Sequence, residues 1–314
     1  MSTAALGEQP GGRRLPYADA PSRVRAWVER ELGSPVAISV DCSGGFSPGP
    51  AARVMSHGGR RAFVKAVGPE LNALTPGLLR SEIAALAAIP PHPSVPRVHA
   101  SYDDGDWVAL MLEDIPGSLP GRPWTVSALE RVADTIATLQ DVLDPCPWSD
   151  APTASRRAAP MFQRWRDLVD DPPADLDPWW SAHLGELADL ASTALDVIDG
   201  DQLAHWDVRS DNLLLTDRVV LLDWGQARRG AAWMDPLLLV VDAVISGADV
   251  DADRLRVRLP LLRDADSGDV ARVVCAIAMA WRHTSRSPTI GLDSLRPWQR
   301  RWADSLTRWL RELL

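Results

Sequence analysis

The pattern of the chain changes at Pro116-Gly117, and this change limits the folds open to it. Before this point, short apolar segments are joined across glycine-rich turns, at Gly58-Gly59 and at residues 103–106. Such segments are typical of antiparallel hairpins. After it, apolar residues recur mostly at the spacing of helices. The sequence therefore predicts an α+β protein, with a small antiparallel sheet followed by a mainly helical part.

The turn residues and the apolar spacing together set the limits of the expected elements. In the first part, we expect helices at residues 21–32 and 75–89 and strands at 36–41, 52–56, 61–67, 98–102 and 107–112. In the second part, we expect helices at 125–143, 161–169, 179–198, 235–246, 251–262, 269–286 and 297–314, with a small hairpin at 213–215 and 219–222. These elements predict a flexible N-terminus at 1–20, an N-terminal lobe at 21–112 and a C-terminal lobe at 113–314.

The charge of the chain excludes some partners and leaves others open. With 33 basic and 42 acidic residues the net charge is −9, which argues against a nucleic acid or an anionic membrane. Residues 1–112 hold 11 basic and 10 acidic side chains, so the acidity belongs to the second part. Three separated cysteines exclude a disulfide scaffold. No signal core or membrane-length apolar run is found, so we expect a cytoplasmic protein with no obligate protein partner.

A single lysine, Lys65, stands among 32 arginines. Arginine is a planar fork and cannot replace lysine where a compact point charge is needed. Lys65 is therefore either a chance survivor of biased codon usage or a residue with a role that arginine cannot perform. Its surroundings, beginning with the predicted strand 61–67, decide between these two readings.

The densest motif is His205-Trp206-Asp207-Val208-Arg209-Ser210-Asp211-Asn212, and Asp223 follows its apolar hairpin. Carboxylate and amide oxygens are the hard ligands that Mg²⁺ prefers. An acidic residue five positions before Asn212 could orient a substrate hydroxyl. This spacing is the catalytic-loop pattern of phosphoryl transfer, with Asp207 as base and with Asn212 and Asp223 as metal ligands.

At these motifs the chain resembles the aminoglycoside phosphotransferase family, which is related to choline kinases and to protein kinases. The resemblance covers roughly residues 35–250, with the motifs in the same order. It implies a two-lobed protein-kinase-like fold with a nucleotide-binding sheet lobe and a helical catalytic lobe. It also implies that Lys65 contacts the phosphates of ATP or GTP, and that Glu82 on the following helix holds Lys65 by an ion pair.

The resemblance assigns further residues to the nucleotide. Gly44, Gly45, Phe46 and Ser47 match the loop that covers the phosphates, although the loop lacks the GxGxxG pattern of protein kinases. In the hinge, the carbonyl group of Glu113 and the amide of Ile115 would hold the adenine.

In the catalytic loop, Arg209 lies where a cation could meet the γ-phosphate. The family usually has glycine where this chain has Trp206, which could pack under the loop or narrow the pocket. We expect His205 to be a buried anchor of this loop. Asp235, followed by Pro236, is expected to cap a helix.

These residues predict an ATP- and Mg²⁺-dependent O-phosphotransferase that acts on a small molecule. The alternatives are a catalytically inactive kinase-like binding protein, a protein kinase and a metal-dependent hydrolase. An inactive copy usually loses the base, the lysine or a metal-binding aspartate, and all of these are present here. The chain has no DFG or APE-like segment of a protein kinase and no pair of histidines four residues apart for a hydrolase metal site. The acidity of the second part favours a cationic acceptor, such as an aminoglycoside or another antibiotic or amino sugar, and hence a role in antibiotic resistance. Choline-like or homoserine-like alcohols fit the motifs equally well. Two candidate acidic rims are formed by Asp170, Asp171, Asp175 and Asp177, and by Asp249, Asp251 and Asp253.

Overall fold

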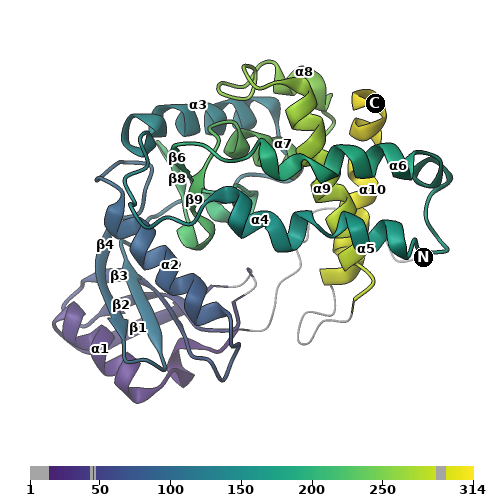
Figure 1. Cartoon of the computed structure of the whole chain (residues 1–314). Helices are drawn as coiled ribbons and strands as arrows, with labels where there is room; N and C mark the ends of the chain where they lie inside the picture. The colour runs from purple at the N-terminus through teal and green to yellow at the C-terminus, as the bar shows by residue number, and fades with distance from the viewer. Residues whose placement is uncertain (1–13, 43–44, 46, 288–294) are drawn as a thin grey trace. The chain divides into compact units, whose positions relative to one another are not determined.

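The computed structural model describes residues 14–42, 45, 47–287 and 295–314. The chain divides into two compact units (Figure 1). One, here called the sheet unit, contains residues 14–120 together with Asp211–Ala227. The other, the helical unit, contains Gly121–Ser210 and Arg228–Leu314. The segment that follows the catalytic loop therefore belongs to the sheet unit.

The sheet unit is built on five antiparallel strands in the order β1-β2-β3-β5-β4. These strands are β1 (Val36–Asp41), β2 (Ala51–Ser56), β3 (Arg61–Val67), β4 (Val98–Asp103) and β5 (Val108–Leu112). Helix α1 (Ser22–Leu32) packs on one face, where Trp27 and Val28 join a core with Val54 and Val64. Gly33, with φ 77°, ends α1 in the left-handed conformation that glycine adopts freely. Helix α2 (Thr75–Ala88) follows β3.

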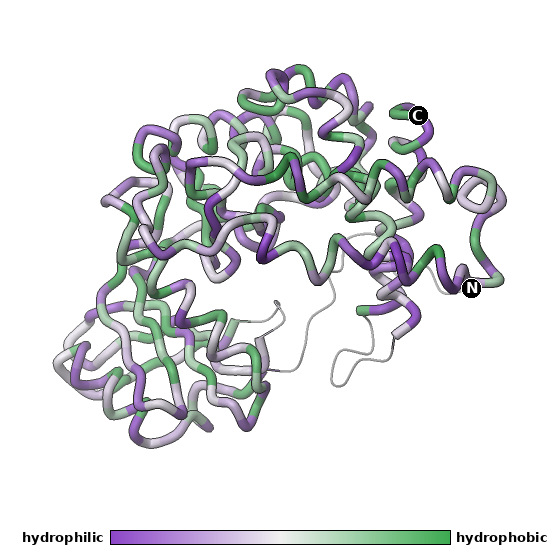
Figure 2. Tube along the Cα trace, in the orientation of Figure 1, coloured by the Kyte–Doolittle hydropathy of each residue, from purple (hydrophilic) through white to green (hydrophobic). Residues whose placement is uncertain are grey.

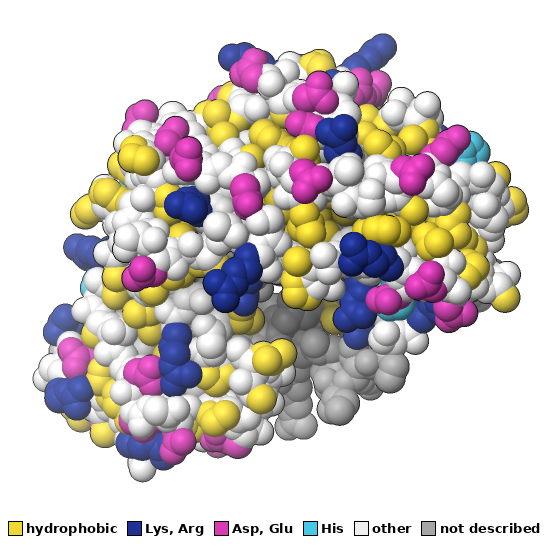
Figure 3. Space-filling view, in the orientation of Figure 1, with side chains coloured by type: hydrophobic (Ala, Val, Ile, Leu, Met, Phe, Trp, Pro, Cys, Tyr) yellow, Lys and Arg dark blue, Asp and Glu magenta, His cyan; other side chains and the backbone are white. Residues whose placement is uncertain are grey.

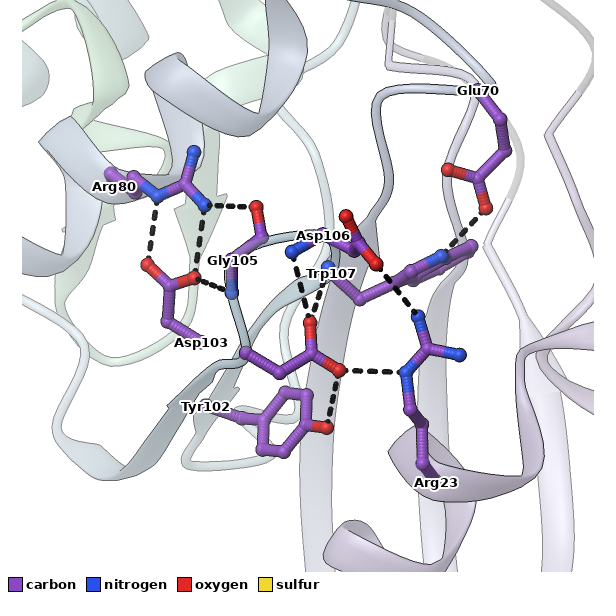
Figure 4. A network of polar contacts seen from close by, with 9 residues as sticks. Arg23, Glu70, Arg80, Tyr102, Asp103, Gly105, Asp106 and Trp107 are labelled. Carbon is purple, nitrogen blue, oxygen red and sulfur yellow. Dashed lines mark hydrogen bonds and ion pairs between the residues drawn. The ribbon is translucent and has the colours of Figure 1, made fainter.

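The tip of the β4–β5 hairpin is tied to both helices (Figure 4). The Asp104 carboxylate accepts backbone N–H bonds from Asp106 at 3.1 Å and Trp107 at 2.7 Å, which closes the turn predicted at 103–106. Arg23 of α1 donates to Asp104 at 2.6 Å, and Arg80 of α2 donates to Asp103 at 2.7 Å. These bonds fix the hairpin against the two helices of the unit.

The N-terminal segment before α1 corrects one expectation. Residues 1–13 lie outside the described residues, but 14–20 do not form a flexible tail. Tyr17, in the short 3-10 helix Tyr17–Asp19, packs into the core beside α1, because its ring is apolar surface that the sheet buries. Its backbone N–H donates to the Asp41 carboxylate at 2.8 Å.

The segment Asp211–Ala227 completes the sheet unit with a second hairpin, β7 (Leu213–Leu215) and β8 (Val219–Leu221). Leu221 N–H donates to the Ser94 carbonyl group at 2.9 Å. Ser118 and Leu215 form a further bridge. The hairpin is thus held by the segments that flank β4 and β5.

The helical unit is organised around two apolar helices. Helix α9 (Ser267–Thr284) packs against α6 (Pro178–Ser192) and α10 (Leu295–Leu313), and α7 (Met234–Ile245) packs against α3 (Val126–Leu143). Both α7 and α9 are buried along nearly their whole length, and Figure 2 shows hydrophobic stretches along them. No helix in the described part of the chain is both long and apolar enough to cross a membrane.

Some predicted helices differ from those observed. The helix expected at 161–169 is divided between α4 (Ala154–Phe162) and α5 (Trp165–Asp170). Helix α6 ends at Ser192 and is followed by a 3-10 turn, and α8 is only Ala252–Arg256. The sequence also gave no sign of the two short paired strands β6 (Gln202–Ala204) and β9 (Arg228–Gly230).

Candidate nucleotide and catalytic site

Lys65 lies on β3 and is held by a carboxylate of α2. Its Nζ atom donates to the two oxygens of Glu82 at 2.9 and 3.0 Å. The lysine side chain is 20% exposed and the glutamate is almost fully buried. Because both oxygens are engaged, the ammonium has one defined position at the surface of the sheet. The predicted pairing of these two residues is therefore present in the structure.

Asp223 joins this pair from the other segment of the sheet unit. Its Oδ1 atom lies 3.5 Å from Lys65 Nζ, and its side chain is 51% exposed. Its backbone is left-handed, with φ 63°, a conformation that costs a non-glycine residue about 1–2 kcal/mol. The next residue, Trp224, has a fully buried side chain and a backbone N–H that bonds to the Glu82 carboxylate. Glu82 thus holds both Lys65 and the turn that carries Asp223.

The charges of this cluster shift each other's proton affinity. Burial raises the pKa of Glu82 to about 7, although the positive charge of Lys65 opposes the shift. For Lys65, burial alone would lower the pKa, but the carboxylates of Asp223 and Glu82 outweigh it and raise the pKa. Lys65 therefore stays charged, while Glu82 titrates near neutral pH.

The residues predicted to bind Mg²⁺ offer a suitable set of donors. Asp223 presents an exposed carboxylate, and Asn212 has a buried amide and accepts a backbone bond from Leu222 at 2.8 Å. Within the described ranges, no three His, Cys, Asp or Glu side chains come together as a metal site. One carboxylate and one amide still fit Mg²⁺, because this ion usually takes its remaining ligands from phosphates and water.

The predicted phosphate loop and hinge lie in the same unit. Gly44 and Phe46 lie outside the described residues. Gly45 has φ 72°, and Ser47 accepts a long bond from the Gly49 N–H at 3.4 Å. In the predicted hinge, the backbone N–H of Glu113 donates to the Arg97 carbonyl group. The Ile115 carbonyl group accepts a hydrogen bond from Arg53 at 3.2 Å.

The predicted catalytic loop belongs to the helical unit up to Ser210, and a buried carboxylate holds it. Asp235 accepts the backbone N–H bonds of His205 and Trp206, both at 2.8 Å. His205 is itself buried, and its Nδ1 accepts from the Asp207 N–H at 3.2 Å, as expected for a loop anchor. The prediction that Asp235 caps a helix is wrong, because α7 already begins at Met234 and the carboxylate points to the loop.

Asp207 and Arg209 are close together in this loop. Arg209 Nε lies 3.2 Å from Asp207 Oδ1, and both side chains are partly exposed. The following residue, Ser210, donates its backbone N–H to Asp242 at 3.0 Å, and Trp124 donates to the same carboxylate at 2.8 Å. Two buried carboxylates of α7, Asp235 and Asp242, therefore fix the two ends of the loop. No sequence motif indicates the role of Asp242, which lies in an apolar helix where a buried carboxylate is unusual.

Trp206 occupies a backbone conformation that suits glycine, with φ 65°. Its ring is covered by the guanidinium of Arg228, 4.4 Å from the ring centroid, and it approaches Gly230, where an added Cβ would lie 3.3 Å from the ring. Arg228 is almost fully buried, and burial lowers its pKa to about 9. The tryptophan thus packs against β9, and this stack offsets the strain of the left-handed residue.

The chain is similar to a known family in sequence and to known proteins in structure. Residues 50–269 match the model of the phosphotransferase enzyme family. No curated protein sequence matches the chain. Among solved structures, a spectinomycin phosphotransferase in complex with ADP and spectinomycin has a TM-score of 0.60 at 10% identity, covering 93% of this chain and 98% of its own.

Two further structures are similar. An aminoglycoside phosphotransferase from Alicyclobacillus acidocaldarius subsp. acidocaldarius DSM 446 has a TM-score of 0.50 at 16% identity, over 84% of this chain and 89% of its own. A putative fructosamine-3-kinase from Haemophilus somnus 129PT has a TM-score of 0.52 at 12% identity, over 90% and 96%. These similarities show that the chain has the predicted protein-kinase-like fold.

Proposed function

The chain belongs to the phosphotransferase enzyme family, in which an alcohol group is the acceptor, and we propose that it transfers the γ-phosphoryl group of ATP or GTP to a small-molecule hydroxyl. The observation that carries this proposal is the cluster of Lys65, Glu82 and Asp223. The only lysine of the chain is held by one buried carboxylate and faces a second that is half exposed. A cation beside a carboxylate that can bind a metal ion is an arrangement suited to a nucleotide phosphate.

Each predicted site residue has a proposed part in the reaction. Lys65 places the α- and β-phosphates, and Asn212 and Asp223 would hold Mg²⁺, which neutralises the phosphate charge when bound. Asp207 orients the acceptor hydroxyl and accepts its proton, and Arg209 meets the γ-phosphate. Positioning and charge neutralisation supply most of the rate enhancement, because phosphoryl transfer needs little covalent chemistry from the protein.

We propose an aminoglycoside, another antibiotic or an amino sugar as the acceptor, with antibiotic resistance as the role. The fold similarity to a spectinomycin phosphotransferase and to a putative fructosamine-3-kinase supports this class. The acidic rims support it less than the net charge suggests, because five of their carboxylates have arginine partners. Those partners are Arg286 for Asp171, Arg282 and Arg300 for Asp175, Arg311 for Asp177, Arg254 for Asp251, and Arg256 for Asp253.

Figure 3 shows the same mixture, with acidic and basic side chains interspersed over the face of the helical unit in view. A second candidate acceptor is therefore a metabolic alcohol that carries a carboxylate, in the manner of homoserine. The observation that favours it is the charge around Asp207, because Arg209 is in contact with this carboxylate and the buried Arg228 interacts with it electrostatically. These cations attract an anionic acceptor and repel a quaternary ammonium such as choline.

A nucleotide-consumption screen tests the proposal. The purified protein is incubated with Mg-ATP or Mg-GTP and with aminoglycosides, spectinomycin, amino sugars, choline and homoserine. We expect one class to stimulate consumption and to be phosphorylated on a hydroxyl, as detected by mass spectrometry. Asp207→Asn is the control and should lower turnover on the order of 10²–10⁴-fold while keeping nucleotide affinity. Absence of nucleotide binding in the wild type, or a fully active Asp207→Asn variant, would contradict the proposal.

The remaining assignments are proposals of the same kind. We place nucleotide binding in residues 21–112 and the catalytic loop and acceptor site in 113–314. We also propose a cytoplasmic enzyme, and the net charge of −9 argues against binding to nucleic acid or to an anionic membrane.

A further inference from the structure

An arginine near the N-terminus contacts the segment that contains the predicted phosphate loop. Arg14 precedes the first 3-10 turn, and its Nη1 atom donates to the Gly49 carbonyl group at 3.2 Å. The next residue, Leu15, donates its backbone N–H to the Pro48 carbonyl group at 2.8 Å. Two successive residues of the N-terminal segment are thus bonded to the end of the loop that leads into β2.

Two glycines of the loop allow close contacts, one with Arg14 and one with β3. A Cβ atom on Gly45 would lie 2.5 Å from Arg14 Nη2, which is closer than any real contact, and φ 72° at Gly45 also favours glycine. A Cβ atom on Gly49 would collide with the carbonyl group of Ala66, the residue next to Lys65. The loop therefore packs against β3 on one side of Gly49 and covers the Arg14 guanidinium at Gly45.

Arg14 and Lys65 share an electrostatic partner. Burial lowers the pKa of Arg14, and the negative charge of Asp223 opposes this shift in part. The guanidinium stays protonated, because the ordinary pKa of arginine lies far above neutral pH. Asp223 also acts on Lys65, which it approaches to 3.5 Å. Two cations from opposite ends of the first 65 residues are thus drawn to one half-exposed carboxylate.

We propose that Arg14 is a second phosphate-binding residue of the nucleotide site. This inference rests on the proposed function and adds to it a residue outside the segment that matches the family, 50–269. The two cations have different tasks. The ammonium of Lys65 is a compact point charge, whereas the guanidinium offers a planar fork that can donate two parallel bonds to a phosphate. The contact with Gly49 orients this fork before the nucleotide binds, so less entropy is lost on binding.

Calorimetric titration of the full chain with Mg-ATP and with adenosine, which has no phosphate, tests the role. We expect Arg14→Gln to weaken Mg-ATP binding about tenfold or more, as for a lost charged hydrogen bond, and to leave adenosine binding within about twofold. Arg14→Lys should restore only part of the affinity, because the fork is lost. Arg30→Gln is the matched control, since this arginine is exposed and pairs only with its neighbour Glu31 among the described residues. It should bind both ligands as the wild type does.

Each other outcome overturns the inference. Unchanged Mg-ATP affinity in Arg14→Gln would show that the guanidinium contacts no phosphate. Tighter binding would show that Arg14 blocks the site, and equal losses for Mg-ATP and adenosine would show that it only supports the loop. Lys65→Gln separates this inference from the proposed function. If Lys65→Gln weakens Mg-ATP binding and Arg14→Gln does not, only the inference fails; if neither does, the proposed nucleotide site fails as well.

Discussion

Glu82 has two partners, and this makes it the central residue of the site. One carboxylate holds the ammonium of Lys65 and accepts the backbone N–H of Trp224, directly after Asp223. A cation and a potential metal ligand are therefore positioned by the same buried group. A substitution of Lys65 or Asp223 is expected to affect nucleotide binding more than folding, since these two side chains keep exposed surface.

Lys65→Arg tests whether the ammonium itself is needed. The charge is kept, but the planar fork does not fit between Glu82 and a phosphate, so kcat/KM should fall by about a hundredfold or more. Steady-state kinetics and a thermal melt measure the two effects. Arg60→Lys, at an exposed position directly before the same strand, is the control and should keep the activity and melting temperature of the wild type. A stable Lys65→Arg protein with normal activity would mean that codon usage alone explains the single lysine.

Asp223→Ala should remove the magnesium dependence of nucleotide affinity. The exposed carboxylate is the best hard ligand of the sheet unit, and alanine offers no oxygen in its place. Titrations with ATP in the presence of Mg²⁺ and of EDTA give the comparison. We expect the two affinities to become equal within about threefold, as a lost metal ligand requires. A variant that still responds to Mg²⁺ like the wild type would disprove this role.

The raised pKa of Glu82 predicts a pH dependence. Only the ionised carboxylate holds Lys65, so nucleotide affinity should rise as the pH increases through about 7. The effect on stability has the opposite sign, because the folded-state pKa lies above the ordinary value of 4.5 and burial of the charge costs stability as the pH rises between these values. Affinities measured from pH 5.5 to 8.5 check this. Glu82→Gln should abolish the step, and an unchanged step in that variant would assign it to another group.

At the scale of elements, local signals predicted the hairpins and distant contacts escaped prediction. The turns at Gly58-Gly59 and at 103–106 lie between alternating segments, so the sequence alone indicates the pairing of their strands. Strands β6 and β9 have three residues each and pair across more than twenty residues, and so carry no periodic pattern. The site residues follow the same rule. Asp207 and Asn212 lie in one local motif and were predicted from it. Arg228 and Asp235 support the loop from distant segments, so Arg228 was missed and Asp235 was wrongly predicted to cap a helix.

The stack of Trp206 on Arg228 predicts a stability effect in the helical unit. Trp206→Gly relieves the strained backbone but leaves a buried guanidinium without its aromatic cover. We expect a net loss of about 2 kcal/mol, because the lost ring contacts and cation–π interaction exceed the relieved strain. Urea denaturation measures it, and a double-mutant cycle with Arg228→Met gives the coupling. Trp206→Phe should lose less. Equal stability of Trp206→Gly and the wild type would show that the stack contributes nothing.

At the scale of the molecule, neither unit is one continuous stretch of chain. The sheet unit needs Asp211–Ala227, which are joined to it only through the 90 residues Gly121–Ser210 of the helical unit. During synthesis, the ribosome therefore releases the five-stranded sheet long before the hairpin that packs beside Ser94 and Ser118. An early product ending near residue 120 would leave those surfaces open to solvent and to chaperones. The sheet unit is thus unlike a module that recombination could move as one gene fragment, and the two units must mature together.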